Sequence, residues 1–367
     1  MSNLLKTTPR QDGFRMPAEY ERHDGCWMIW PERPDTFRLA ARPAQLAFVE
    51  TATAISQFEP VTMCASPTQY RLARSKLPEH IRVVEMSNND AWMRDTGPIF
   101  VNNGVEVRAV DWGFNAWGGL QGGLYFPWDL DELVAQKVAE IEKVHRYKAP
   151  MILEGGSIAV DGEGTLITTR QCLLNPNRNP QLSQAQIENH LQNYLGVEKI
   201  IWLENGCLFD ETDGHIDDVC CFIKPGVVAL TWTDDHSDPQ FERMNEALDT
   251  LQASTNARGR RLEIHKIHQP DPVCFTAQES ATIEAVESTY MRPEGMRMAA
   301  TYINFYLANG GAVVPLFNDP HDAPALRSLQ QLMPDRKVVG ISGGREIILG
   351  GGNVHCITQQ QPAPQSR

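Results

Sequence analysis

One pattern recurs along this 367-residue chain: an apolar stretch, a turn at a glycine, a second apolar stretch, and then a segment with helical periodicity. The turns of the four copies lie at Gly104, Gly162, Gly226 and Gly310. The apolar stretches are nearly continuous, which is typical of strands that are covered on both faces. Repetition of a hairpin followed by a helix predicts an α/β fold whose units form a closed or propeller-like arrangement.

Periodicity and turn residues place further elements before and between the hairpins. We expect helices over residues 42–58, 68–77, 130–144, 183–195, 240–251 and 323–332, and strands over 26–30, 60–65 and 81–86. No linker-like composition divides the chain, so we expect one domain over residues 1–367. Within it we expect a flexible lead-in at about 1–20 and a flexible polar tail at 359–367. Residues 271–300 break the repeat, and we expect an insertion or a flap there.

Composition and charge exclude several classes of protein. The chain has 42% hydrophobic and 22% charged residues, as soluble globular proteins do. No segment approaches the roughly 20 apolar residues that cross a bilayer or resembles a signal peptide, so we expect a cytoplasmic protein without a membrane partner. The eight cysteines lack the spacing of a disulfide framework, which indicates free thiols. The net charge of −13, without a basic cluster, indicates no nucleic-acid partner and mildly favours cationic ligands.

In the first three copies an ionisable side chain stands at the start of the first strand. Asp95 and Asp217 each lie nine residues before the glycine of the turn, and Glu154 lies eight residues before it. Taken singly, each could be a turn cap or an edge charge. Taken together, equivalent positions in a pseudo-symmetric ring would meet near its axis. Carboxylates in one pocket repel each other unless they share a cation, and a planar guanidinium matches them best.

A cysteine and a histidine complete the candidate set. Cys356 follows three glycines in the stretch from Ile347 to Thr358, which we expect to be a strand. Glycines allow close approach of a ligand, and a thiol is a good nucleophile, although a small buried side chain is the usual role of cysteine. His215 lies two residues before Asp217, so both would face the same side of a strand, with His215 transferring protons.

A zinc site is the natural alternative, because His215, Asp217, His355 and Cys356 are all ligand types. Adjacent residues of a strand face opposite ways, so His355 and Cys356 would not share one site. The chain also lacks C-x-x-C and H-E-x-x-H spacing. We therefore expect no metal.

Aromatic and acidic residues could hold the remainder of a ligand. Trp92, Trp112 and Trp117 accompany the first hairpin, and their faces could flank an alkyl chain or a cation, although tryptophans usually pack in cores. Glu211, in the acidic segment 210–213, could bind a distal ammonium group directly or through water. A solvated acidic loop is the alternative for that segment.

On these residues the chain resembles the agmatine deiminases, members of the guanidino-modifying (pentein) superfamily. The matching stretches span nearly the whole chain and are Trp92-Met-Arg-Asp-Thr-Gly-Pro98, Asp111-Trp-Gly-Phe-Asn-Ala-Trp-Gly-Gly119, Leu153-Glu-Gly-Gly-Ser157, Asp213-Gly-His-Ile-Asp217 and Gly350-Gly-Gly-Asn-Val-His-Cys-Ile-Thr-Gln-Gln360. The segment 112–119 is the most specific to agmatine deiminases. The Glu-Gly-Gly and Asp-Gly-His-Ile-Asp motifs are shared with relatives that act on other guanidines.

The resemblance implies a five-bladed ββαβ propeller with its site on the axis. It also implies hydrolysis of agmatine to N-carbamoylputrescine and ammonia by a C–N hydrolase of linear amidines, without metal or organic cofactor. Putrescine biosynthesis from arginine and a homo-oligomer are further implications. Three alternatives remain open: a deiminase of free or peptide-terminal arginine, a guanidino methyl-hydrolase or amidinotransferase, and a non-catalytic pentein that binds a partner or a cation.

By motif match, Cys356 would be the nucleophile that forms an amidino-cysteine intermediate, and His215 the general acid and base. Asp95 and Asp217 would grip the guanidinium, and Glu154 would lie beside His215. Because these carboxylates disfavour a thiolate, we expect a raised pKa for the thiol of the free enzyme. A cationic substrate would lower that pKa again.

Overall fold

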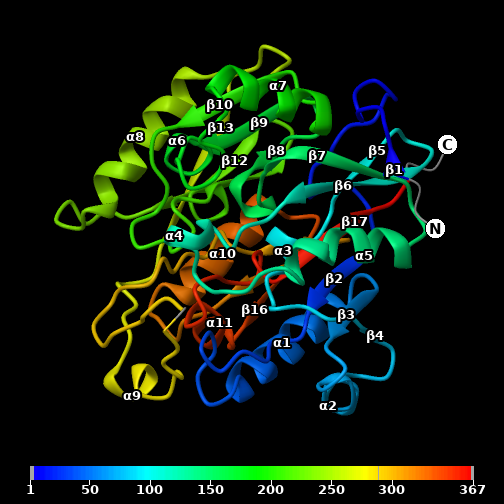
Figure 1. Cartoon of the computed structure of the whole chain (residues 1–367). Helices are drawn as coiled ribbons and strands as arrows, with labels where there is room; N and C mark the ends of the chain where they lie inside the picture. The colour runs from blue at the N-terminus through cyan, green and yellow to red at the C-terminus, as the bar shows by residue number, and fades with distance from the viewer. Residues whose placement is uncertain (1–3, 288, 365–367) are drawn as a thin grey trace.

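The computed structural model describes residues 4–287 and 289–364, which fold into an α/β protein with five small sheets (Figure 1). Across these sheets the strands are, in spatial order, β1 (Leu4–Leu5), β7 (Arg146–Ile152), β6 (Val107–Gly113) and β5 (Ile99–Asn102); β10 (Lys199–Leu203), β9 (Thr165–Thr169) and β8 (Ala159–Val160); β11 (Cys220–Lys224), β12 (Val227–Trp232) and β13 (Glu263–His268); β14 (Tyr306–Ala308), β15 (Gly311–Pro315) and β16 (Lys337–Ile341); and β17 (Thr358–Pro362), β2 (His23–Ile29), β3 (Val61–Ala65) and β4 (Arg82–Glu85). The α/β prediction is confirmed.

Helices connect the strands and cover the sheets. The α-helices are α1 (Arg42–Ile55), α2 (Tyr70–Lys76), α3 (Met93–Thr96), α4 (Gly119–Gly122), α5 (Val134–Ile141), α6 (Arg170–Leu173), α7 (Gln184–Leu195), α8 (Gln240–Ala253), α9 (Ala277–Ser280), α10 (Asp322–Leu332) and α11 (Gly344–Ile348), and the 3-10 turns are η1 (Asp131–Leu133), η2 (Gly155–Ser157) and η3 (Ile216–Asp218). Among these described helices, none is long and apolar enough to cross a membrane.

Each sheet contains the same ββαβ unit. In four of them a hairpin is followed by a helix and by a strand that pairs in parallel with the second strand of the hairpin. The fifth unit is made from the two ends of the chain, because red β17 pairs antiparallel with blue β2 (Figure 1). The side chains of Trp27 and Gln361 join these strands through a hydrogen bond of 2.8 Å. The sequence pattern missed this unit because its antiparallel strands lie at opposite ends of the chain.

Helix α7 shows how local sequence sets these elements. Ser183 and Gln186 form a reciprocal capping box at its start, which satisfies two backbone donors. The buried residues Ile187, Leu191 and Leu195 recur at a spacing of four, so one face of the helix packs against the sheet. Gly196 ends the helix with a φ of 68°, in the left-handed region that glycine favours.

The lead-in and the tail differ from the expected flexible segments. Strand β1 pairs with β7, and the lead-in also places Phe14 and Met16 in the core. Residues 359–362 belong to β17 and are largely buried, so the prediction of a flexible tail is wrong for them. Their glutamines suggested a solvated segment, but the backbone of β17 pairs with β2 and so completes a sheet. Residues 1–3 and 365–367 lie outside the described part of the chain.

The stretch from Ile347 to Thr358 is also not the expected strand. It contains the end of α11, a glycine loop and a turn, and only Thr358 begins β17. Glycine is required in this loop because a Cβ on Gly351, whose φ is 108°, would lie 2.4 Å from Glu211 Oε2. The thiol of Cys356 therefore projects from a turn that leads into an edge strand.

Candidate active site

Five polar residues meet because each precedes the edge strand of a different sheet. The edge strands are β5, β8, β11, β14 and β17, and the residues before them are Asp95, Glu154, Asp217, Asn304 and Cys356. Strand β17 lies beside β5, and β8 lies beside β11. Asp95 is in α3 and Asp217 in η3, so these side chains are presented by short turns and not by the strands expected from the sequence. The spacing argument nevertheless placed Asp95, Glu154 and Asp217 correctly relative to the repeat, whereas Cys356 was predicted from its glycine-rich stretch.

Asn304 is the member that the sequence analysis missed. Its Nδ2 donates to the sulfur of Cys356 at 3.3 Å, and it also donates to Asp218 Oδ1 at 3.1 Å. The fourth hairpin begins just after Asn304, so the repeat contained the signal. The pattern in the sequence was defined by ionisable side chains, and the amide of Asn304 does not ionise.

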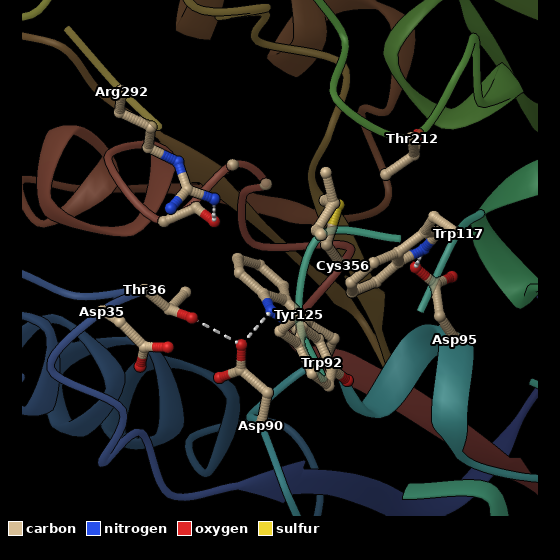
Figure 2. A pocket seen from close by; sticks show the side chains of 14 residues that line it. Asp35, Thr36, Asp90, Trp92, Asp95, Trp117, Tyr125, Thr212, Arg292 and Cys356 are labelled. Carbon is tan, nitrogen blue, oxygen red and sulfur yellow. Dashed lines mark hydrogen bonds between the residues drawn. The ribbon is translucent and has the colours of Figure 1, made fainter. Parts of the chain in front are cut away.

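Cys356 lines a pocket together with aromatic, acidic and glycine residues (Figure 2). The other lining residues are Asp35, Thr36, Asp90, Trp92, Asp95, Trp117, Leu124, Tyr125, Thr212, Arg292, Gly350, Gly351 and Gly352. The sulfur lies 3.6 Å from Asp217 Oδ2. Burial, together with the negative charges of Asp217, Asp218 and Asp95, raises the pKa of the Cys356 thiol well above its usual value. The thiol of the empty site is therefore neutral at pH 7.

His215 lies between two carboxylates. Its Nδ1 is 3.9 Å from Asp95 Oδ2, and its Nε2 is 3.8 Å from Glu154 Oε2. Burial lowers the pKa of His215, but the charge of Asp95 and the nearby side chains of Cys172 and Glu154 outweigh burial and raise it well above the usual value. His215 is therefore protonated in the empty site and is ready to donate a proton.

Gly156 permits this close arrangement. A Cβ at this position would lie 2.6 Å from His215 Nδ1 and 2.9 Å from Asp217 Oδ2. The backbone N–H of Gly156 also donates to Asp95 Oδ1 at 2.9 Å. Burial raises the pKa of Asp95 to about 6, with Asp217 and Glu154 adding to the rise and His215 opposing it.

Arg178 was not predicted and holds Glu154 from the side opposite His215. Its Nε donates to Glu154 Oε1 at 2.6 Å, and both side chains are fully buried. Burial raises the pKa of Glu154, but the charges of Arg178 and His215 outweigh burial and lower it to about 2. Glu154 is thus an anion that stabilises protonated His215.

Three buried atoms at this centre have no hydrogen-bond partner among the described residues. They are Glu154 Oε2, His215 Nε2 and Asp217 Oδ1. Buried polar atoms in proteins are nearly always paired, and exceptions call for an explanation such as an absent ligand. Glu154 Oε2 and His215 Nε2 face each other at 3.8 Å, which leaves Asp217 Oδ1 as the acceptor that fits a donor from a small, planar ligand.

Comparison with known proteins shows the family to which this chain belongs. Residues 15–362 match the family of Porphyromonas-type peptidyl-arginine deiminases. The chain belongs to this family. Agmatine deiminase from Pseudomonas aeruginosa (strain LESB58) is 56% identical over 368 residues, which cover 100% of both chains. Agmatine deiminase from Ectopseudomonas mendocina (strain ymp) is 54% identical over 364 residues, covering 98% of this chain and 99% of that protein.

A solved structure, the agmatine deiminase of Enterococcus faecalis catalysing its reaction, superimposes with a TM-score of 0.96. It is 49% identical, and the match covers 99% of this chain and 100% of that one. The resemblance to agmatine deiminases that the motifs indicated is therefore confirmed. This member of the peptidyl-arginine deiminase family shares its α/β fold with that structure.

Two tryptophans of this family member lie at the pocket, and one predicted tryptophan does not. Trp92 Nε1 donates to Asp90 Oδ2 at 3.0 Å, and Trp117 Nε1 donates to Asp95 Oδ2 at 2.9 Å. Trp112 lies on β6 and packs against Tyr194, with ring centroids 5.6 Å apart. The prediction of Trp112 as a binding residue is corrected, because its side chain faces a core cluster outside the pocket.

Glu211 does not offer a free carboxylate to a ligand. Arg292 binds both of its oxygens, Nε to Oε1 at 2.9 Å and Nη2 to Oε2 at 2.6 Å. Arg292 also donates to the carbonyl of Gly350 at 2.9 Å and lines the pocket. The irregular segment 271–300 thus supplies Arg292 to the site, and the prediction that Glu211 binds an ammonium is corrected.

Two groups within the described chain bring possible metal ligands together. The ligand atoms of Glu154, Cys172 and His215 lie within 4.8 Å of one another, as do those of Asp271, Asp319 and His321. In the first group Arg178 already supplies a positive charge to Glu154. In the second, His321 Nδ1 already contacts Asp319 at 2.9 Å. Neither group is the set of four ligand types weighed in the sequence analysis.

Proposed function

We propose that this protein is an agmatine deiminase, a C–N hydrolase that converts agmatine to N-carbamoylputrescine and ammonia. The observation that carries this proposal is the carboxylate beside the Cys356 thiol: the sulfur lies 3.6 Å from Asp217 Oδ2, and Asp217 Oδ1 is buried without a hydrogen-bond partner among the described residues. A guanidinium presents five N–H donors in one plane, which suits carboxylates around a nucleophile. Relatives that are named agmatine deiminase, at 56% and 54% identity, support agmatine as the guanidine.

In the proposed reaction the guanidinium cation binds between Asp95 and Asp217, and the Cys356 thiol releases its proton to solvent. The thiolate then attacks the guanidinium carbon, which these carboxylates hold within reach. His215 donates a proton to the departing nitrogen, and ammonia leaves an amidino-thioether on Cys356. His215 then accepts a proton from water, which adds to the same carbon. The C–S bond breaks, the ureido product leaves, and the thiol is restored.

We propose that the five sheets are the blades of a closed ring in one domain, with this centre on its axis. Delivery of one site residue by each of the five edge strands supports that arrangement. The same resemblance supports putrescine biosynthesis from arginine, a cytoplasmic location and a homo-oligomer as further parts of the proposal.

The distal end of the pocket would receive the amine of agmatine. In Figure 2, Asp35, Thr36 and Arg292 lie across the pocket from Asp95. The charge of Arg292 is balanced by Glu211, and Arg33 approaches Asp35 at 2.5 Å. Asp90 is buried, and its oxygens accept hydrogen bonds from Thr36, Trp92 and the backbone of Ala91. Burial raises the pKa of Asp90 and the charge of Arg33 opposes that rise, and we assign Asp90 as the acidic group that would face the ammonium.

We expect Asp90→Asn to raise KM for agmatine by about tenfold or more, because a charge-assisted hydrogen bond to the amine is lost. The value of kcat should change much less, since Asp90 does not contact the reacting carbon. Thr36→Val is the matched control, because it removes one hydrogen bond to Asp90 and keeps the charge. Steady-state kinetics with equal KM values for the two variants would contradict this assignment.

A deiminase of arginine is the second candidate, and the presence of Arg292 at the pocket favours it. An α-carboxylate would need this cation, but Glu211 already occupies it. The test is an endpoint assay for ureido product and ammonia with agmatine, arginine and a peptide ending in arginine. We expect product from agmatine alone. Product from arginine would support the proposed reaction but would show that arginine is the substrate. The absence of product from all three compounds would indicate a non-catalytic binding protein.

A further inference from the structure

A second imidazole lies behind the site, on the other side of the Asp217 carboxylate. His355 Nδ1 lies 2.8 Å from Asp217 Oδ2, and His355 Nε2 lies 2.8 Å from Glu19 Oε1 and 3.0 Å from Glu19 Oε2. Both ring nitrogens thus face acceptors. An imidazole donates to two carboxylates only when both nitrogens carry a proton, so the contacts describe an imidazolium between two anions.

Arg94 fixes this arrangement to the backbone of the catalytic turn. Its backbone N–H donates to the carbonyl of Cys356 at 3.1 Å, and its Nε donates to the carbonyl of His355 at 3.2 Å. Its Nη1 pairs with Glu19 Oε1 at 3.1 Å. Glu19 comes from the lead-in, which therefore reaches the active site from behind.

Charged and titratable groups from several elements surround His355. The charged groups are Asp217 from η3, Glu19 from the lead-in and Arg94 from α3, and the neutral groups are the thiols of Cys220 and Cys221 on β11 and of Cys356 in the same turn. Burial and Arg94 oppose protonation of His355, but Glu19 and Asp217 outweigh them, and its pKa is raised. Burial raises the pKa of Asp217, yet His355, His215 and Arg94 lower it overall.

The two carboxylate oxygens of Asp217 have different surroundings. Oδ2 faces His355 and lies 3.6 Å from the Cys356 sulfur, whereas Oδ1 is buried and has no partner among the described residues. A carboxylate that is held through one oxygen cannot rotate freely, so its second oxygen keeps a fixed direction. Glu19 accepts a hydrogen bond from Nε2 of His355. This bond fixes the orientation of the imidazole ring, and with it the direction in which Nδ1–H points toward Asp217.

We propose that Glu19 and His355 are positioning residues, which keep Asp217 ionised and aim its free oxygen at the guanidinium of the substrate. The proposal rests on the proposed function, because it assigns these residues to the same site. Neither side chain touches the substrate. Removal of the Glu19 charge lowers the proton affinity of His355, so Asp217 loses part of a stabilising cation and its pKa rises. Less Asp217 is then ionised at low pH.

The experiment compares charge with shape at position 19. We expect Glu19→Gln to raise KM for agmatine about tenfold with kcat changed less than threefold, and the deficit in kcat/KM to grow as the pH falls from 8 to 6. Glu19→Asp, which keeps the charge, should recover most of the loss. Glu21→Gln is the matched control in the same segment, where it removes a charge from the Arg15 pair, and its pH profile should equal that of the wild type.

A second variant tests the histidine itself. His355→Asn keeps a donor near the Nδ1 position but loses the charge and the contact with Glu19. We expect it to match Glu19→Gln, and the double variant should lose no more than His355→Asn alone, since the two residues act as one unit.

If Glu19 and His355 only stabilised the fold, their variants would behave differently from those of positioning residues. If the Glu19 variants lower only the fraction of active enzyme and the melting temperature, with KM and the pH profile unchanged, the proposal is overturned. Additive losses in the double variant would also overturn it. If the wild-type protein yields product from none of the three guanidines, the proposed function is refuted. The positioning role is then tested by agmatine binding alone. If the wild type binds agmatine tightly and Glu19→Gln binds it with the same affinity, the positioning role is refuted as well.

Discussion

Replacement of Cys356 by serine is expected to lower the turnover of agmatine by about 10⁴-fold or more, because it removes the group that forms the covalent bond. A hydroxyl is far less acidic than a thiol, and His215 is protonated in the empty site, so no free base stands ready to activate it. The measurement is ureido product over a full day with purified protein. Cys274→Ser, a change in a free cysteine outside the pocket, is the control and should keep full activity.

Binding of agmatine to the serine variant separates chemistry from folding. Calorimetry should show a ligand affinity close to the KM of the wild type, since the carboxylates remain in place. Activity of the variant within tenfold of the wild type would show that water attacks the guanidinium directly. The covalent route would then be wrong.

Alkylation of Cys356 should be slow in the free protein and should become faster when a small guanidine is bound. The thiolate is the reactive form, and burial with three nearby carboxylates raises the thiol pKa well above its usual value. Below that pKa the alkylation rate should rise about tenfold for each pH unit. A bound cation lowers the pKa, so more thiolate is present at the same pH and the rate increases.

The readout is the rate of iodoacetamide incorporation between pH 6 and 10, with and without methylguanidine. Cys356→Ser provides the background from the two partly exposed thiols, Cys221 and Cys274. A midpoint below the roughly 8.5 of a free thiol would contradict activation by the substrate. Protection by the guanidine at every pH would contradict it as well.

The repeat in the sequence was enough to predict that Asp95, Glu154 and Asp217 lie near one another, and Cys356 joined them through its glycine-rich stretch. Equivalent positions of a repeated unit have equivalent environments, so their spacing from the hairpin turn carried three-dimensional information. The conformation at those positions was not predicted, because short helical turns and a glycine loop lack the periodicity that identifies strands. Asn304 lies at the equivalent position of the fourth unit, but its side chain is an amide and the prediction considered only ionisable side chains.

Contacts between distant segments could not be read from the pattern. Glu211 was expected to bind an ammonium, but its partner Arg292 comes from an irregular segment without any repeat. Trp112 was placed in the pocket because it neighbours the motif, whereas its position on β6 turns it toward another core. Glu19 gave no signal at all, since its role exists only where the lead-in meets the turn at His355.

The pairing of β17 with β2 has a consequence for protein synthesis. Strand β2 leaves the ribosome well before β17, so it lacks its edge neighbour until β17 has been translated. Among the proposed catalytic residues Cys356 is also the last in chain order, two residues before β17. Domains begin to fold while they are being made. A nascent chain can therefore assemble the acidic binding groups early, but it acquires its reactive sulfur only with the strand that closes the final sheet.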